Sequence, residues 1–485
     1  MTARDRPVHA RPAAGAEPPQ DGLSPPTLYW AMLVIASGIC LSVLDATLIS
    51  VALPTISREL QVAASASVWV INAYQIAIVV AILPLATLGD KVGYRRVYRI
   101  GMLVFVLASV CCTLSETVGE LGASRALQGL GAAGVMSVNA ALVRLIYPRA
   151  RLGRGIALNA FVVAGASAAG PTIAAGILAV AEWRWLFIIN IPLGLATLAG
   201  AMKYLPPSAK SPRPFDLLSA LLNVLTFGLV FVGVDSLGHL DFSASTFLIL
   251  GAGIGIGIVF VRRQMRLPLP LLPLDLLRIP VFALSMGTSI CSFAAQMIAF
   301  VSLPFFLQYT LGHTAVETGL LMTPWPLALM VTAPISGRLL DHYPAGLLGG
   351  VGLGIFATGL LALAFLPAAP GALDVAWRMA LCGVGFGLFQ SPNNHTILTT
   401  APPNRSGGAS GMLGTARLTG QTIGATIVAL TFALAPERSW IAMVIGAVLA
   451  GGGAAFSSLR VGASARALSR TAAPAAAPPD GKDAR

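Results

Sequence analysis

Long apolar runs separated by short polar segments dominate the pattern along the chain. A run of roughly 20 apolar residues is long enough to cross a bilayer as a helix. Such runs lie at about 28–52, 66–89, 97–116, 119–146, 154–180, 185–204, 215–234, 245–262, 281–308, 315–338, 346–366, 373–398, 407–434 and 439–459. The pattern therefore predicts an all-α polytopic membrane protein with fourteen transmembrane helices.

Composition agrees with this prediction and excludes an ordinary soluble domain. Hydrophobic residues make up 56% of the chain and charged residues only 10%, whereas soluble proteins carry about 25% charged residues. The net charge of +12 does not indicate nucleic-acid binding, because the basic residues form short clusters between apolar runs. The five cysteines lie inside apolar runs without metal or redox spacing, so no metal site is expected.

The basic clusters also predict how the chain is oriented. They fall in alternate loops and in both tails, and Arg460 is counted with the C-terminal tail. The other set of loops holds only Arg58, Arg184, Arg378 and Arg438. Because cytoplasmic loops are enriched in Lys and Arg, both termini are predicted to be cytoplasmic. The expected location is a plasma membrane, the inner membrane in a bacterium.

Apart from charges near the span ends, the clear intramembrane charges are Asp45, Arg125 and Arg417. Asp45 lies roughly 10 Å and Arg125 roughly 9 Å from the outer ends of their predicted helices, at 1.5 Å per residue. These matching depths predict an interaction between the two side chains. Intramembrane charges usually mark ion or substrate pathways, so the pair is interpreted as a site of proton coupling or substrate binding. A permanent structural ion pair is the alternative.

Two pairs of similar segments predict an internal repeat. "ATLGDKVGYRR" (86–96) is echoed by "GRLLDHYPAGL" (337–347), and "RALQGLGAAG" (125–134) by "RMALCGVGFG" (378–387). Parallel repeats of this kind are typical of transporters. The predicted domains are an N-terminal six-helix bundle at 28–204, a linker with two extra transmembrane helices at 205–280, and a C-terminal six-helix bundle at 281–459. Disordered cytoplasmic tails are expected at 1–27 and 460–485.

Several of these segments resemble motifs of the major facilitator superfamily. "LATLGDKVGYRRV" (85–97) resembles the family's loop between helices two and three, and "RALQGLGAAGV" its helix-four motif. "GASAAGPTIAAG" (165–176) resembles the helix-five motif of its antiporters. "LDATLISVALPTI" and "EWRWLFIINIPLG" are similar to signatures of its fourteen-helix drug:H+ antiporter branch. The resemblance covers residues 28–459 and implies the major facilitator fold, with two extra helices between the six-helix bundles.

The resemblance also implies roles for two groups of residues. The loop group would act as a charge relay that locks one conformation, although a solvated basic loop serving only topology is the alternative. Its members are Asp90, Lys91, Gly93, Arg95 and Arg96, with Asp341 at the repeated position. Tyr94 departs from the family pattern, in which a basic residue is common. The helix-five group would allow close packing and form part of a gate, and consists of Gly165, Gly170, Pro171 and Gly176.

A central cavity is expected between the two bundles. Arg417 is interpreted either as a cation satisfied by carbonyls or the polar run at 390–394, or as a cavity residue that tunes the local potential. For the aromatic candidates, packing is the alternative to ligand binding. The candidate lining residues are Trp69, Tyr74, Asn139, Trp325, Gln390, Asn393, Asn394 and Gln421.

Together these features predict a proton-coupled secondary active exporter of lipophilic, cationic drugs or antiseptics that works by alternating access. The proton gradient would replace any cofactor, because the chain carries no nucleotide-binding loop. The expected partners are the substrate, protons and the lipid bilayer, without nucleic acid, and a monomer is expected to suffice. Export of a neutral or anionic metabolite is the alternative. A membrane sensor or membrane-embedded enzyme is disfavoured, because neither an output domain nor a catalytic constellation is recognisable.

Overall fold

A computed structural model of the protein describes residues 21–208, 210–211, 215–238, 242–267, 270–367, 369–402, 405–435 and 438–472. All regular secondary structure in these ranges is helical, which confirms the all-α prediction. The outer parts of the two predicted tails, 1–20 and 473–485, lie outside the described residues.

The first part of the chain forms the helices predicted for the N-terminal bundle. Two of them, those around residues 66–89 and 185–204, each begin with a separate short turn. The elements are α1 (Thr27–Glu59), α2 (Ala64–Ser67), α3 (Trp69–Val92), α4 (Tyr94–Leu114), α5 (Val118–Ile146), η1 (Arg149–Arg151), α6 (Leu152–Val180), α7 (Trp185–Ile188) and α8 (Asn190–Tyr204).

The remaining elements follow in the same manner. Two helices lie between the two groups of six, and the predicted spans at 281–308 and 315–338 are each divided into two elements. The elements are α9 (Leu217–Gly238), α10 (Ala244–Gln264), η2 (Leu274–Arg278), α11 (Pro280–Phe305), η3 (Phe306–Thr310), α12 (Ala315–Met322), α13 (Pro324–Leu339), α14 (Ala345–Ala364), α15 (Ala372–Thr400), α16 (Ser406–Leu434) and α17 (Trp440–Ala472).

Within the described residues, thirteen helical spans are long and apolar enough to cross a membrane. The fourteenth predicted span, at 407–434, corresponds to α16, which has 29 residues but contains the polar side chains of Arg417 and Gln421. Two helices are longer than expected from hydropathy. α1 continues to Glu59 rather than ending near residue 52, and α17 continues to Ala472, past the predicted start of the tail at 460.

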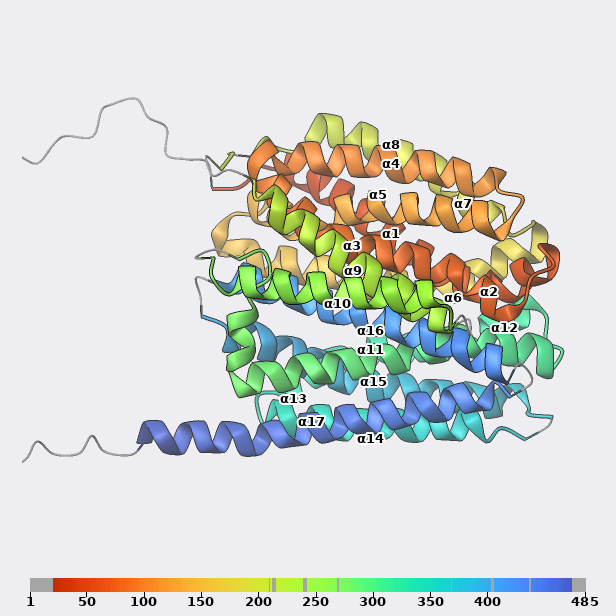
Figure 1. Cartoon of the computed structure of the whole chain (residues 1–485). Helices are drawn as coiled ribbons and strands as arrows, with labels where there is room; N and C mark the ends of the chain where they lie inside the picture. Colours follow the sequence, from red (N-terminus) through yellow and green to blue (C-terminus); the bar gives the residue numbers. More distant parts are fainter. Residues whose placement is uncertain are drawn as a thin grey trace, which may run out of the picture.

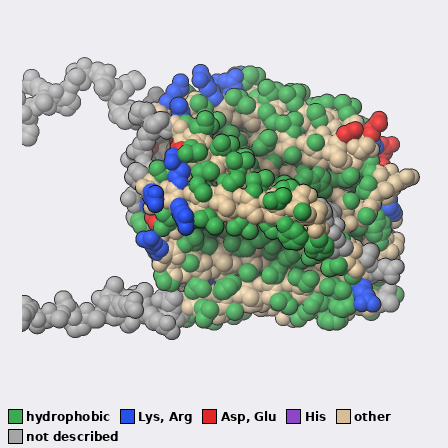
Figure 2. Space-filling view, viewed as in Figure 1, with side chains coloured by type: hydrophobic (Ala, Val, Ile, Leu, Met, Phe, Trp, Pro, Cys, Tyr) green, Lys and Arg blue, Asp and Glu red, His purple; other side chains and the backbone are tan. Residues whose placement is uncertain are grey.

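The long helices run in one general direction, and the start of α1 and the end of α17 lie at the same end of the bundle (Figure 1). We call this end the tail side and the opposite end the far side. On the face that Figure 2 shows, hydrophobic side chains are spread over the flank of the bundle, most Lys and Arg gather on the tail side, and a group of Asp and Glu lies on the far side. An apolar belt between two charged ends is the surface expected of a protein that spans a bilayer.

The internal repeat is visible in helix packing. A Cβ added at Gly101 of α4 would lie 2.8 Å from the carbonyl oxygen of Gly131 in α5. In the second half, a Cβ at Gly352 of α14 would lie 2.7 Å from the carbonyl oxygen of Gly385 in α15. Small residues let membrane helices approach closely, and this pair of contacts recurs at corresponding places of the two six-helix groups.

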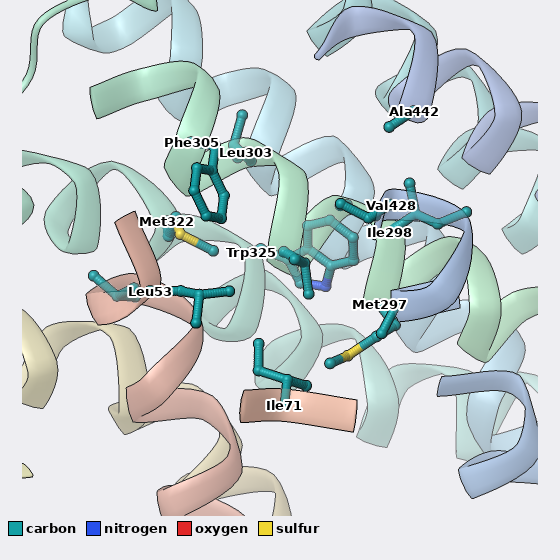
Figure 3. Close-up of a cluster of buried hydrophobic side chains, with 14 of the residues drawn as sticks. Leu53, Ile71, Met297, Ile298, Leu303, Phe305, Met322, Trp325, Val428 and Ala442 are labelled. Carbon is teal, nitrogen blue, oxygen red and sulfur yellow. The ribbon is translucent and has the colours of Figure 1, made fainter. Parts of the chain in front are cut away.

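The two six-helix groups meet tightly on the far side. A single buried cluster joins Leu53 of α1 and Ile71 of α3 with Leu303 of α11 and Trp325 of α13 (Figure 3). Polar contacts rim this cluster. Arg58 donates to Gln308 at 3.1 Å, and the Tyr309 hydroxyl donates to the Pro54 carbonyl at 3.1 Å. The far side is therefore closed by contacts between the groups.

The two extra helices pack as a pair on one flank. α9 and α10 contact each other, and α9 also contacts α3 and α16 (Figure 1). In the first half of α9, the Asn223 side chain donates to the Val80 carbonyl of α3 at 2.8 Å. The pair therefore covers the flank where helices of the two groups lie side by side.

Candidate functional site

Asp45 and Arg125, which were predicted to interact, form an ion pair in the interior. Arg125 Nη1 contacts Asp45 Oδ2, and the exposed fractions of the two side chains are only 1%. Removing two charges from water is costly unless each is paired and hydrogen-bonded. The pair therefore needs further polar partners, and neighbouring helices provide them.

Two side-chain amides complete the carboxylate's hydrogen bonds. Asn190 at the start of α8 donates to Asp45 Oδ1 at 2.7 Å, and Gln128 of α5 donates to the same oxygen at 3.1 Å. Gln128 also accepts from Arg125 at 2.5 Å and donates to Ser109 of α4 at 2.9 Å. One carboxylate thus links α1, α5 and α8, with α4 attached through Gln128.

Tyr74 of α3 separates this polar cluster from a central cavity. The Arg125 guanidinium lies 4.1 Å from the centroid of the Tyr74 ring, within cation–π range. The Tyr74 hydroxyl donates to the Ser42 carbonyl of α1 at 2.8 Å, and Arg125 Nε donates to the Val70 carbonyl at 3.2 Å. Tyr74 and Ser42 both line the cavity, so the ion pair lies one side chain behind its wall.

The depth expected for Asp45 was wrong, although its expected partner was right. The prediction placed Asp45 seven residues before the end of its helix, but α1 continues to Glu59. Its final turns carry Ser57, Arg58 and Glu59, polar residues that hydropathy assigns to a loop. Asp45 is therefore roughly 21 Å from the end of α1 at 1.5 Å per residue. The pair still forms because α1 extends beyond the start of α5 on the far side.

The central cavity has a volume of about 410 Å³ and lies between the two six-helix groups. Small-molecule sites typically have volumes of about 300–1,000 Å³. Five predicted residues line it: Tyr74, Gln390, Asn394, Arg417 and Gln421. The lining also contains residues that the sequence prediction did not select, among them Thr47, Gln75, Ser167, Gln296, Met297, Phe300, Phe386 and Ser391. The cavity wall therefore combines aromatic, amide and hydroxyl groups.

Four of the predicted lining residues lie elsewhere. Trp69 packs against Gly122 of α5, and Asn139 donates to Asn159 of α6 at 2.8 Å. Trp325 is buried among aromatic rings, including Phe300 at 5.1 Å between centroids. Asn393 does not line the cavity, because its side chain is hydrogen-bonded to Ser289 of α11 and Arg460 of α17. For Trp69 and Trp325, the packing alternative describes the structure better than the ligand-binding one.

Asn393 belongs to a second buried polar cluster that sequence reasoning missed. Arg460 of α17, counted above with the cytoplasmic tail, is only 2% exposed. Its Nη1 donates to Asn393 Oδ1 at 2.7 Å and to the Ser285 hydroxyl at 2.9 Å. Asn393 in turn donates to Ser289 at 2.7 Å. The assignment of Arg460 to the tail is therefore wrong, because α17 continues past it and its side chain turns inward.

A further buried acid also escaped the sequence prediction. Asp235, three residues before the end of α9, is 5% exposed and accepts a hydrogen bond from Asn72 of α3. It lies near the far side and does not line the central cavity. Its position in an otherwise apolar helix was the available signal, but its closeness to the helix end made it resemble a loop residue.

The loop between α3 and α4 contains the predicted relay residues. Gly93 has φ +102°, a conformation that favours glycine, and ends α3. Asp90 accepts from the Tyr94 hydroxyl at 2.7 Å, so the residue that departs from the family pattern satisfies the carboxylate. Arg95 donates to the Met202 carbonyl of α8. The remaining predicted members, Lys91, Arg96 and Asp341, make no side-chain hydrogen bond or ion pair within the described part of the chain.

The helix-five group divides into two kinds of position. A Cβ at Gly170 would clash with Thr47 of α1, and the Pro171 carbonyl of α6 approaches Gly319 of α12. A Cβ at Gly165 or Gly176 would meet nothing within 4 Å. Gly170 and Pro171 therefore lie where α6 is packed between the two groups, whereas the two outer glycines have free space.

Comparison with known proteins places this geometry in a family. Residues 35–425 match the Major Facilitator Superfamily. The fold is similar to that of a POT family transporter crystallised with 5-aminolevulinic acid, with a TM-score of 0.69 and 14% identity over 92% of this chain and 98% of the other. At that identity the likeness concerns the fold alone.

Two relatives extend the comparison at the sequence level. The protein described as uncharacterized transporter YebQ of Escherichia coli is 53% identical over 91% of this chain and 97% of its own. Multidrug resistance protein Stp of Mycobacterium tuberculosis is 32% identical over 83% of this chain and 75% of its own. The all-helical fold, the repeat and these matches agree: the chain is a multi-pass membrane protein that belongs to the Major Facilitator Superfamily.

Proposed function

We propose that the protein is a proton-coupled secondary active exporter of small lipophilic organic compounds, within the drug:H+ antiporter branch of its family. The observation that carries the proposal is the buried Asp45 carboxylate, paired with Arg125 directly behind Tyr74 of the cavity wall. A carboxyl group in that position can bind a proton that arrives through the cavity. Relatives that include a multidrug resistance protein support the export of organic compounds.

The hydrogen bonds of Asp45 explain how proton binding would change the conformation. The ionised carboxylate accepts from three residues on two other helices: Arg125, Gln128 and Asn190. Protonation removes the charge that holds Arg125 and converts one acceptor oxygen into a donor. The α1–α5–α8 arrangement is then less strongly favoured. A ligand shifts a conformational equilibrium by its difference in affinity for the two states, and here the proton is that ligand.

We propose that the tail side faces the cytoplasm and that the far side faces outward. The distribution of basic side chains supports this orientation (Figure 2). In that orientation, the closed far side keeps the cavity from the exterior, as alternating access requires in one of its states. The cavity and the ion pair lie within one chain, so we propose that a monomer is sufficient.

The cavity lining favours a neutral or anionic substrate, which was the alternative, over the cationic substrate first predicted from the sequence. Aromatic and aliphatic side chains suit a lipophilic body, but none of the described lining residues is acidic and one, Arg417, is basic. A cationic substrate would find no counterion in this wall. Export of neutral or anionic compounds is therefore the better-supported form of the proposal.

The proposal is tested by drug susceptibility in a bacterial host that lacks its own efflux pumps. Expression of the wild-type protein should raise resistance to members of a panel of lipophilic drugs. Asp45→Asn should abolish this resistance at equal protein levels in the membrane. Asp374→Asn, the same chemical change at a partly exposed far-side carboxylate paired with Arg378, should retain it. If Asp45→Asn gives full resistance, Asp45 does not couple transport to proton movement, and the Asp45–Arg125 pair is only structural.

A further inference from the structure

Arg417 is a cation that has no counterion among the residues that the structure describes. It lies near the middle of α16 and lines the central cavity. Its Nε is buried without a hydrogen-bond partner, and no ion pair joins it to any acidic residue in the described part of the chain. Its guanidinium lies 5.7 Å from the ring centroid of Phe293, which gives only a weak cation–π contact.

The two buried arginines described above differ from Arg417 in this respect. Arg125 is neutralised by Asp45, and Arg460 donates to several side-chain oxygens. Arg417 is partly buried, with its Nε fully enclosed, and a guanidinium removed from bulk water is costly unless it is paired and hydrogen-bonded. The guanidinium of Arg417 lines a cavity that is large enough for a small molecule. A ligand in that cavity can therefore accept the hydrogen bonds for which the described protein groups offer no acceptor.

The surroundings of Arg417 define what that ligand would look like. Gln390, Asn394 and Gln421 also line the cavity and offer amide groups. The rings of Phe300 and Phe386 also line the cavity. A planar guanidinium binds carboxylates and similar oxyanions with paired hydrogen bonds, whereas aromatic rings suit a flat apolar body.

We propose that the cavity binds organic anions, namely compounds with a flat aromatic body and one carboxylate or sulfonate group, and that Arg417 is the counterion of that group. This inference rests on the proposed function, because it concerns the cavity of the same exporter. The proposal places the proton and the negative charge of the substrate at two separate sites. Asp45 takes the proton behind Tyr74, and Arg417 takes the acidic group of the substrate in the opposite half.

The test uses three fluorescent probes that share one ring system and differ in charge: dansylglycine (anionic), dansylamide (neutral) and dansylcholine (cationic). Binding to the purified protein is followed by probe fluorescence. The wild type should bind dansylglycine most tightly. Arg417→Gln should weaken dansylglycine binding by about tenfold or more, because a charge-assisted hydrogen bond is lost, and should leave dansylamide binding nearly unchanged. Arg417→Lys keeps the positive charge and should therefore retain part of the preference for dansylglycine that Arg417→Gln loses.

Two further variants make the test specific. Arg266→Gln removes one positive charge from an exposed tail-side position and should not change any of the three affinities. Gln421→Glu places a carboxylate in the cavity and should reverse the preference toward dansylcholine. The proposal is overturned if the wild type binds dansylcholine as tightly as dansylglycine, if none of the probes binds saturably, or if Arg417→Gln keeps the anionic preference.

The failure of this inference can be distinguished from failure of the proposed function. Asp45→Asn should still bind dansylglycine, because the proton site does not contact the substrate. If that variant binds the probe but still exports drugs, proton coupling at Asp45 is wrong and the anion site stands. If it loses export while Arg417→Gln keeps the anionic preference, the coupling role stands and the anion site is wrong.

Discussion

At the scale of single residues, three arginines inside the described part of the bundle have three different environments: Arg125 and Arg460 are buried, whereas Arg417 is partly buried at the cavity wall. Arg125 has a carboxylate, Arg460 has neutral oxygen acceptors, and Arg417 has the cavity. Because burial penalises an unpaired charge, the environment of each arginine indicates its use. Arg125 belongs to a proposed switch, Arg460 to the packing of α17 against α11 and α15, and Arg417 to a proposed ligand site.

The first prediction concerns Arg460. Arg460→Leu removes the donor to Asn393 and leaves that acceptor buried, which costs about 1–3 kcal/mol for each unsatisfied group. The purified variant should therefore unfold at a lower temperature than the wild type when its thermal unfolding is followed in detergent. Arg262→Leu, at an exposed tail-side position, is the control and should change the unfolding temperature little. Equal unfolding temperatures for Arg460→Leu and the wild type would show that the cluster contributes nothing to stability.

The sequence was sufficient to predict the Asp45–Arg125 pair, because these residues are among the few charges inside apolar runs. Gln128 could also have been predicted as a partner of the pair, since it lies three residues after Arg125 and so on the same helix face. The burial of Arg460 could not be predicted, because this residue follows an apolar run and looks like a tail residue. Whether Asn393 or Asn394 faces the cavity depends on helix rotation, and helices that are apolar on all sides carry no clear signal for it.

At the scale of elements, hydropathy located the helices well and their ends less well. Hydropathy detects the part of a helix that lies in lipid, not the part that continues beyond it. α1 and α17 therefore extend past their predicted ends. The break between α12 and α13 falls at Thr323, immediately before two prolines at positions 324 and 326. Proline at the start of a helix is well tolerated, and this signal was available in the sequence.

The second prediction concerns α6 and separates its glycines. Gly170→Ala should disturb the packing of α6 on α1, because the new methyl group would clash with Thr47. Transport activity and the yield of folded protein should both fall. Gly165→Ala and Gly176→Ala are matched controls with free space around the new methyl group, and both should behave as the wild type.

A double variant checks the mechanism of this effect. Thr47→Ala removes the hydroxyl group nearest to the new methyl and should restore part of the activity lost in Gly170→Ala. If all three alanine variants are equally active, close approach at Gly170 is not required. If all three are equally defective, the motif acts through helix flexibility rather than through packing.

At the scale of the whole molecule, two groups of six helices repeat the same contacts and leave a cavity between them. The paired Gly101–Gly131 and Gly352–Gly385 contacts show this repetition, which the sequence echoes had indicated. The chemistry is not repeated. The first group holds the Asp45–Arg125 pair, whereas the second contributes Arg417 to the cavity. A repeat predicts the scaffold, but not how the charges are divided between its halves.

The third prediction concerns orientation. The start of α1 and the end of α17 lie at the end of the bundle where most basic side chains gather (Figures 1 and 2), so both termini should lie in the cytoplasm. Green fluorescent protein fused to either terminus should fluoresce, and alkaline phosphatase fused to either terminus should be inactive. A phosphatase fusion placed after α10 should also be inactive, whereas one placed in the loop between α1 and α2 should be active. An active phosphatase at a terminus would contradict the proposed orientation.

The central claim is that the Asp45 carboxylate couples transport to proton movement. The most direct measurement compares wild-type protein and Asp45→Asn in proteoliposomes, using a radiolabelled compound identified by the susceptibility panel. Two modes are recorded: exchange of labelled for unlabelled compound without a pH gradient, and accumulation driven by an acidic lumen. If protonation of Asp45 drives transport, Asp45→Asn should retain exchange and lose accumulation. Accumulation by Asp45→Asn at the wild-type rate and extent would contradict the central claim.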